Sequence, residues 1–136
     1  MDEPATIVLS PNPRGKYLCT ITVIVDGWSS TIRFPSRRKW VQDLFLKMVY
    51  KFGRIKSITT PSLYKFDTAG NQFEPVLWPP TIAFDFPREK LRILSALTLV
   101  KAKHRKKLER LFEEDYEKFE EEVATIAVAE GLTFGG

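Results

Sequence analysis

The sequence of 136 residues contains only one cysteine, Cys19, and one histidine, His104. A single cysteine excludes an intrachain disulfide and a zinc site made of several thiolates, and it favours an intracellular, reducing compartment. A single histidine makes a Ser-His-Asp relay or a site with several histidine ligands difficult to build. We therefore expect neither a metal site nor a cofactor.

Long hydrophobic runs are also absent. No stretch approaches 18 consecutive apolar residues, so we expect no membrane span, and the acidic residues 1–4 are unlike a secretory signal. With 43% apolar and 12% aromatic residues, the chain can still form a globular core. Its net charge of +4 permits an acidic partner without requiring one. These features predict an intracellular protein, cytoplasmic or nuclear.

Catalytic motifs are scarce in this chain. Gly27, Gly53 and Gly70 are isolated from one another and each lies at an expected turn, so no glycine-rich phosphate loop is present. A pair of carboxylates could form among four aspartates, although aspartate more often forms turns and helix caps. These aspartates are Asp26, Asp43, Asp67 and Asp85. We predict a protein without enzymatic activity.

The first part of the chain predicts β-structure. Apolar and polar residues alternate through residues 16–34, and Asp26-Gly27 in their middle is a preferred pair for a tight hairpin turn. We therefore expect a β-hairpin here. The preceding residues, 1–15, contain three prolines and predict an extended N-terminal arm.

A helix is predicted directly after this hairpin. Pro35 ends the second strand, and Ser36 can cap a helix in which apolar residues recur at helical spacing up to Phe52. Gly53 is the expected stop signal. Three short strands are predicted beyond it, at residues 62–66, 72–77 and 81–86.

The order of an early hairpin, a crossing helix and later strands predicts an α+β, ubiquitin-like β-grasp domain over residues 16–86. Two segments carry a family resemblance: Thr31-Ile32-Arg33-Phe34-Pro35-Ser36 leading into Trp40-Val41-Gln42-Asp43-Leu44, and Leu63-Tyr64-Lys65-Phe66-Asp67 with Gly70 and Phe73. On these residues the chain resembles the doublecortin and Phox-and-Bem interaction modules of the ubiquitin-like superfamily. This resemblance implies a non-catalytic binding domain.

Glycine and proline are both missing between Arg88 and Glu130. This predicts one long, charged, amphipathic helix over residues 87–130, followed by a flexible tail over residues 131–136. The first half of the helix is basic and the second half is acidic. Apolar residues within it repeat at a spacing close to that of a coiled coil. We call six of them the helix seam: Leu108, Phe112, Tyr116, Phe119, Val123 and Ile126.

Two arrangements of this segment remain open. The helix can extend away from the domain and pack its seam on a partner helix or on a second copy, which gives a homodimer. It can instead break near Lys101 and fold back onto the domain's own sheet. We favour the first arrangement, because so long a pattern without internal caps is typical of coiled coils. Lys101 and His104 interrupt the apolar stripe, either as a pH-sensitive break or as a polar gap that meets water.

Six basic residues form a candidate binding surface, which we call the basic set: Arg33, Arg37, Arg38, Lys39, Arg54 and Lys56. They are either a solvated face or contacts to an acidic partner. With the family resemblance, they predict a protein-interaction scaffold, cytoskeletal or microtubule-associated, that docks on an acidic, tubulin-like protein surface. The alternative is a small basic protein that binds nucleic acid and dimerises through its C-terminal helix.

Overall fold

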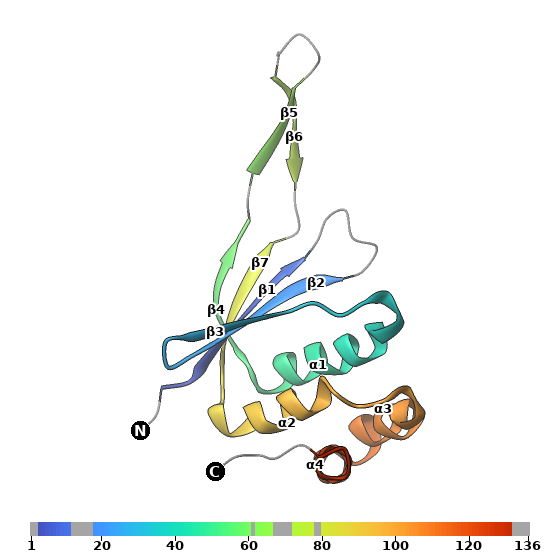
Figure 1. Ribbon diagram of the computed structural model, residues 1–136. Coiled ribbons are helices and arrows are strands. Elements are labelled where there is room, and N and C mark those ends of the chain that lie inside the picture. Colours follow the sequence, from blue (N-terminus) through green and yellow to red (C-terminus); the bar gives the residue numbers. More distant parts are fainter. Residues whose placement is uncertain (1–2, 12–17, 61, 67–71, 78–79, 132–136) are drawn as a thin grey trace.

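The computed structural model describes residues 3–11, 18–60, 62–66, 72–77 and 80–131, of which residues 62–66 and 72–77 are described by their backbone alone. Within them, an antiparallel sheet is covered on one face by helices (Figure 1). Its five strands are β1 (Ala5–Pro11), β2 (Cys19–Val25), β3 (Trp28–Ile32), β4 (Arg54–Thr59) and β7 (Thr81–Phe86). Their order across the sheet is β3-β2-β1-β7-β4. The predicted α+β class is confirmed.

The described α-helices all lie on the same side of this sheet (Figure 1). They are α1 (Lys39–Phe52), α2 (Leu91–Leu97), α3 (Arg105–Glu114) and α4 (Tyr116–Ala129). The first helix begins after a 3₁₀ turn at Ser36–Arg38, and it ends at Gly53 as predicted. A Cβ atom at Gly53 would lie 2.4 Å from the carbonyl oxygen of Val49, so only glycine fits at this helix end.

The predicted hairpin is formed by β2 and β3. Asp26 and Gly27 have φ angles of 50° and 78°, which are the left-handed values that a two-residue turn of this kind requires. Val25 pairs with Trp28 directly across the turn. The asparagine-like tolerance of Asp26 for positive φ and the freedom of Gly27 therefore fix the register of the whole hairpin.

The ubiquitin-like β-grasp is not confirmed, because the later strands do not complete the hairpin directly. Instead β1 lies in the middle of the sheet and pairs antiparallel with both β2 and β7. Ala5, Ile7 and Leu9 of this strand are buried. The segment expected to be an extended arm thus contributes the central strand, whose alternate residues form part of the hydrophobic core.

A second, two-stranded sheet consists of β5 (Ser62–Phe66) and β6 (Gln72–Leu77). It continues the direction of β4 and β7 and projects beyond the five-stranded sheet (Figure 1). The predicted strands at residues 62–66, 72–77 and 81–86 are therefore all present, but the first two pair only with each other in the described part of the chain.

The single long helix predicted over residues 87–130 is wrong. The segment is divided into α2, α3 and α4, with 3₁₀ turns at Arg88–Lys90 and Ala102–His104. Lys101 is extended, with φ −86° and ψ 156°, and this break near Lys101 is the one anticipated in the alternative arrangement. The second break is at Asp115, whose carboxylate accepts a hydrogen bond from the Lys118 amide at 3.3 Å and caps α4.

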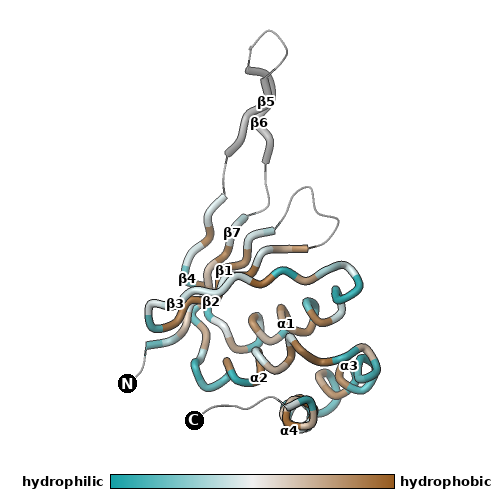
Figure 2. The backbone as a smooth tube through the Cα atoms, viewed as in Figure 1, coloured by the Kyte–Doolittle hydropathy of each residue, from teal (hydrophilic) through white to brown (hydrophobic). Residues whose placement is uncertain are grey.

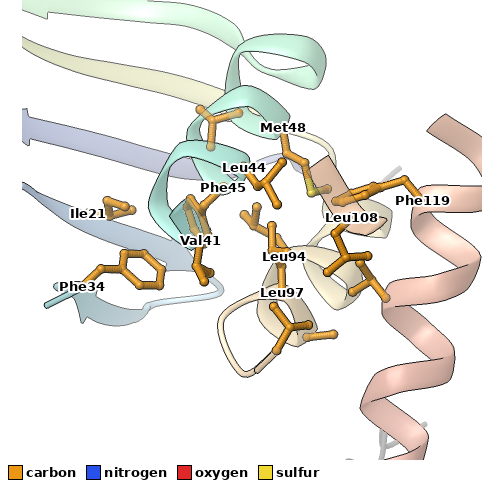
Figure 3. Packing of buried hydrophobic residues seen from close by; sticks show 14 of the residues in the cluster. Ile21, Phe34, Val41, Leu44, Phe45, Met48, Leu94, Leu97, Leu108 and Phe119 are labelled. Atoms are coloured by element: carbon orange, nitrogen blue, oxygen red, sulfur yellow. The ribbon is translucent and has the colours of Figure 1, made fainter. Parts of the chain in front are cut away.

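The helix seam is packed inside the protein. Leu108, Phe119, Val123 and Ile126 are buried, and Phe112 and Tyr116 are partly buried against the same core. Figure 3 shows the ring of Phe119 beside Met48 of α1, with Leu108 close to both. Figure 2 shows α3 as largely hydrophilic, so this helix contributes to the core through few residues, namely Leu108, Leu111 and Phe112. In this fold the seam contacts the chain's own α1 and α2 rather than a partner helix.

Basic residues from the first half of this segment form ion pairs with acidic residues from its second half. Because α4 folds back on α3, Lys107 pairs with Glu122 at 3.1 Å and Lys101 pairs with Glu130 at 3.2 Å. The lysines of these ion pairs are exposed and the glutamates are partly buried, and each pair contributes about 0–1 kcal/mol. The opposite charges expected to attract a partner helix therefore lie on consecutive helices of one molecule.

Candidate functional site

The two edges of the five-stranded sheet differ in how they are protected. The edge strand β4 carries Arg54 and Lys56, and its pairing with β7 is irregular between Ile55 and Ser57. Charges and bulges are the usual devices that prevent another strand from pairing with an edge. The opposite edge strand, β3, has the sequence Trp-Ser-Ser-Thr-Ile, with no charge, no proline and no bulge. This edge is therefore open to an additional strand.

The backbone of β3 offers hydrogen-bonding groups on this open edge. Val25 and Trp28 close the two-residue turn as a hydrogen-bonded pair, so Trp28, Ser30 and Ile32 turn their amides and carbonyls toward β2. The corresponding groups of Ser29 and Thr31 face away from β2. In the described part of the chain no strand pairs with them.

A small apolar cavity of about 110 Å³ lies beside this edge, between β3 and α2. Its lining residues are Val23, Ser30, Ile32, Phe45, Leu91, Leu94 and Ser95. The two serines are exposed and stand at its rim, whereas Leu94 and Phe45 are buried at its floor. We call the free edge of β3 together with this cavity the edge groove.

Polar contacts hold α2 alongside β3 at both ends of the groove. At one end, Arg88 forms a two-pronged ion pair with Asp26, with 2.8 Å between Nη1 and Oδ1. The Arg88 guanidinium also holds the pKa of Asp26 below its ordinary value of 3.8. At the other end, Arg38 donates to the carbonyl oxygens of Thr98 at 2.8 Å and Val100 at 3.0 Å. The groove thus has walls that are fixed before any ligand arrives.

The structure divides the basic set between the two edges of the sheet. Arg33 follows β3, and its Nε donates to the Thr20 hydroxyl at 3.3 Å. Arg33 is exposed beside the edge groove, and so is the 3₁₀ turn that contains Arg37. Arg54 and Lys56 lie on β4, four strand spacings or about 19 Å away. Lys39 pairs with Asp43 at 3.1 Å. The set is therefore not one continuous surface.

Arg38 has a structural role within the set, which leads to a stability prediction. Replacing Arg38 by alanine removes the donor to Thr98 and Val100 at the break after α2. We expect the free energy of unfolding to fall by about 1.5–3 kcal/mol, because the lost hydrogen bonds involve a charged donor. Urea denaturation of Arg38→Ala measures this, and the neighbouring Arg37→Ala is the matched control, expected to change stability by about 0.5 kcal/mol or less. Equal effects at both positions would contradict the assignment.

The groups considered for catalysis lie apart from one another. Asp26, Asp43 and Asp85 pair with different cations, namely Arg88, Lys39 and Lys56, and Asp67 lies outside the described residues. His104 ends the 3₁₀ turn between α2 and α3. Burial raises the pKa of the Cys19 thiol above its ordinary value. Among the described residues, no group of three or more His, Cys, Asp or Glu side chains could hold a metal ion.

Comparison of the chain with protein-family models, with curated proteins and with solved structures finds no match. None of the helices in the described part of the chain combines the length and the apolar character needed to cross a bilayer.

The edge groove was not anticipated from the sequence. A weak signal was present, since a strand of five uncharged residues begins with a tryptophan immediately after a turn. Nothing local indicated that β3 would be an edge or that Leu91 and Ser95 would stand beside it. Those facts depend on contacts between segments about 60 residues apart.

Proposed function

We propose that this protein is a non-enzymatic binding module that captures an extended segment of another protein by adding it as a strand to β3. The observation that carries this proposal is an unprotected sheet edge with an apolar cavity directly beside it. In strand addition, main-chain hydrogen bonds supply affinity, and pockets for alternate side chains supply specificity. The outward-facing backbone amides and carbonyls of Ser29 and Thr31 provide the main-chain hydrogen bonds. The apolar cavity provides the pocket for a side chain.

The chemistry of the two faces defines the preferred segment. Side chains of the added strand alternate between the helix-covered face, where the cavity is apolar, and the opposite face, where Arg33 lies beside Thr20. A segment that alternates apolar and acidic residues therefore fits best. The sequence predicts docking on an acidic, tubulin-like protein surface, and an extended acidic segment of a cytoskeletal protein would meet this requirement.

Binding of two designed peptides tests this function. We expect a fluorescein-labelled nonapeptide of alternating valine and glutamate to bind at least tenfold more tightly than one of alternating valine and lysine, measured by fluorescence anisotropy. The Ser95→Trp variant should lose this binding, because an indole at the exposed rim of the cavity blocks the groove. Val128→Trp, at an exposed position on α4, is the control. Equal affinity for both peptides, or full binding by Ser95→Trp, would argue against strand capture.

A second candidate function rests on the uncovered face of the sheet. The register places hydroxyl side chains on this face, and all of them are at least partly exposed: Thr6, Ser10, Thr20, Thr22, Ser29, Thr31, Ser57, Thr59 and Thr81. Arg33 borders the face on one side, and Arg54 and Lys56 border it on the other. Hydroxyl and cationic groups are typical contacts to phosphates, whereas stacking on bases would need aromatic side chains there. This arrangement favours backbone contacts to a nucleic acid.

The salt dependence of binding to a labelled 20-nucleotide RNA tests the second candidate. Three cations that each neutralise one phosphate predict that log Kobs falls with log [salt] with a slope of roughly −2. Replacing Arg54 and Lys56 together by glutamine should bring the slope to roughly −0.7. The absence of RNA binding at low salt, or a slope that the double replacement does not change, would remove this candidate.

A further inference from the structure

Trp28 is the most exposed large hydrophobic side chain among the described residues, with 79% of its surface accessible. It lies at the start of β3 on the helix-covered face of the sheet, opposite Val25. The helices do not reach over it, and the edge groove begins directly beside it. A largely exposed tryptophan next to an open strand edge is the kind of aromatic anchor that dominates protein interfaces.

We propose that two copies of this chain pair through their β3 strands, antiparallel and centred on Ser30. In this register Ser29 of each copy faces Thr31 of the other, so that the backbone groups on the two free edges satisfy one another. Trp28, Ser30 and Ile32 lie on the helix-covered face of β3, and in this register they pair with one another. The helix-covered faces of both copies therefore remain on the same side of the joined sheet. The result is one continuous sheet of ten strands.

The side chains of β3 complement themselves in this arrangement. Trp28 of each copy meets Ile32 of the other, at the mouth of the apolar cavity that Ile32 and Ser95 line. No charge lies within β3, so no like charges are brought together along the shared edge. At each end, Arg33 of the second copy falls opposite Gly27, beside the turn whose Asp26 carboxylate already pairs with Arg88.

This pairing regulates the groove. The second copy occupies the same backbone groups and the same cavity that would receive an extended segment, so self-association and segment capture exclude one another. This competitive step rests on the proposed function, whereas the pairing itself does not. An acidic segment would therefore bind to dissociated chains, and its apparent affinity would fall as the protein concentration rises.

Disulfide trapping tests the pairing. The two Ser30 residues form a non-hydrogen-bonded pair in this register, with Cα atoms about 4.5 Å apart, which is within the range that a disulfide bridges. In a Cys19→Ala background, Ser30→Cys should form a covalent dimer with oxidised glutathione, and Ser57→Cys on the opposite edge should not. Equal trapping at both positions, or none at Ser30→Cys, would overturn the proposal.

Sedimentation equilibrium supplies a measurement without cross-linking. We expect the unmodified chain to approach twice its mass of 15.7 kDa at high concentration, and Trp28→Ser to dissociate at least tenfold more readily. A mass of one chain at several hundred micromolar would contradict the pairing. If dimers form but the valine–glutamate peptide does not bind even to the dissociated chain at low protein concentration, strand capture fails and the pairing stands. If the peptide binds to a chain that remains monomeric, the pairing fails and strand capture stands.

Discussion

Replacement of Phe119 by alanine is expected to lower the free energy of unfolding by about 3–5 kcal/mol. The Phe119 side chain is fully buried, stands beside Met48 and contacts the rings of Phe112 and Tyr116 edge-on or tilted at 5.1 and 5.3 Å between centroids. Removing it leaves a cavity between α4 and α1. Chemical denaturation of Phe119→Ala against the unmodified chain measures the change.

The control for this prediction is Val128→Ala on the same helix. Val128 is 66% exposed, so its truncation should change stability by about 0.5 kcal/mol or less. If Phe119 instead faced a partner helix, Phe119→Ala would leave the stability of the isolated chain unchanged and weaken self-association. A loss of less than about 1 kcal/mol would therefore contradict the packing of the helix seam described above.

The second large effect concerns the free edge of β3. Thr31→Pro removes the amide donor that faces away from β2 and places a pyrrolidine ring where an added strand would lie. We expect the variant to fold, since proline is tolerated on an edge strand when its nitrogen faces solvent. Binding of the valine–glutamate peptide should weaken at least tenfold, which corresponds to about 1.4 kcal/mol.

Thr31→Val is the matched variant for this experiment, because it keeps the backbone amide and the branched shape while it removes the hydroxyl. It should bind the peptide as the unmodified chain does. Circular dichroism and urea denaturation confirm that both variants remain folded. Normal peptide binding by a folded Thr31→Pro variant would exclude main-chain recognition at this edge.

The parts of the fold that depend on local chemistry were predictable. The turn at Asp26-Gly27 needs two residues that tolerate positive φ. Helix α1 ends at Gly53, where the Cβ atom of any other residue would clash with the Val49 carbonyl oxygen. The turn signal at Asp26-Gly27 and the glycine stop signal at Gly53 each act over only a few residues. The hairpin and the first helix were accordingly identified from the sequence.

Local signals failed where long-range contacts decide the structure. The alternation of Ala5, Ile7 and Leu9 was visible, but the prolines around it suggested an arm rather than the central strand of a sheet. The long helical pattern contained no glycine or proline, yet it breaks at Lys101 and at Asp115. Arg38, about 60 residues away, binds the carbonyls at the first break, and this contact has no local signature.

The candidate site was predictable only in its charges. Arg33 was identified from the sequence and does lie beside the groove, as does the turn that contains Arg37 and Arg38, but Lys39 pairs with Asp43, and Arg54 and Lys56 lie on the opposite edge. The groove itself exists because α2 lies alongside β3, held by Arg88 at one end and Arg38 at the other. Because β3 and α2 are far apart in the sequence, no sequence motif could predict the groove.

Residue-resolved amide hydrogen exchange, followed by NMR at low protein concentration with saturating valine–glutamate peptide, tests strand capture most directly. Added main-chain hydrogen bonds should slow the exchange of the Ser29 and Thr31 amides at least tenfold, while amides on the opposite edge strand β4 keep their rates. Slower exchange along β4 or in the helices instead, or unchanged rates in β3 with the peptide bound, would contradict recognition through the edge groove.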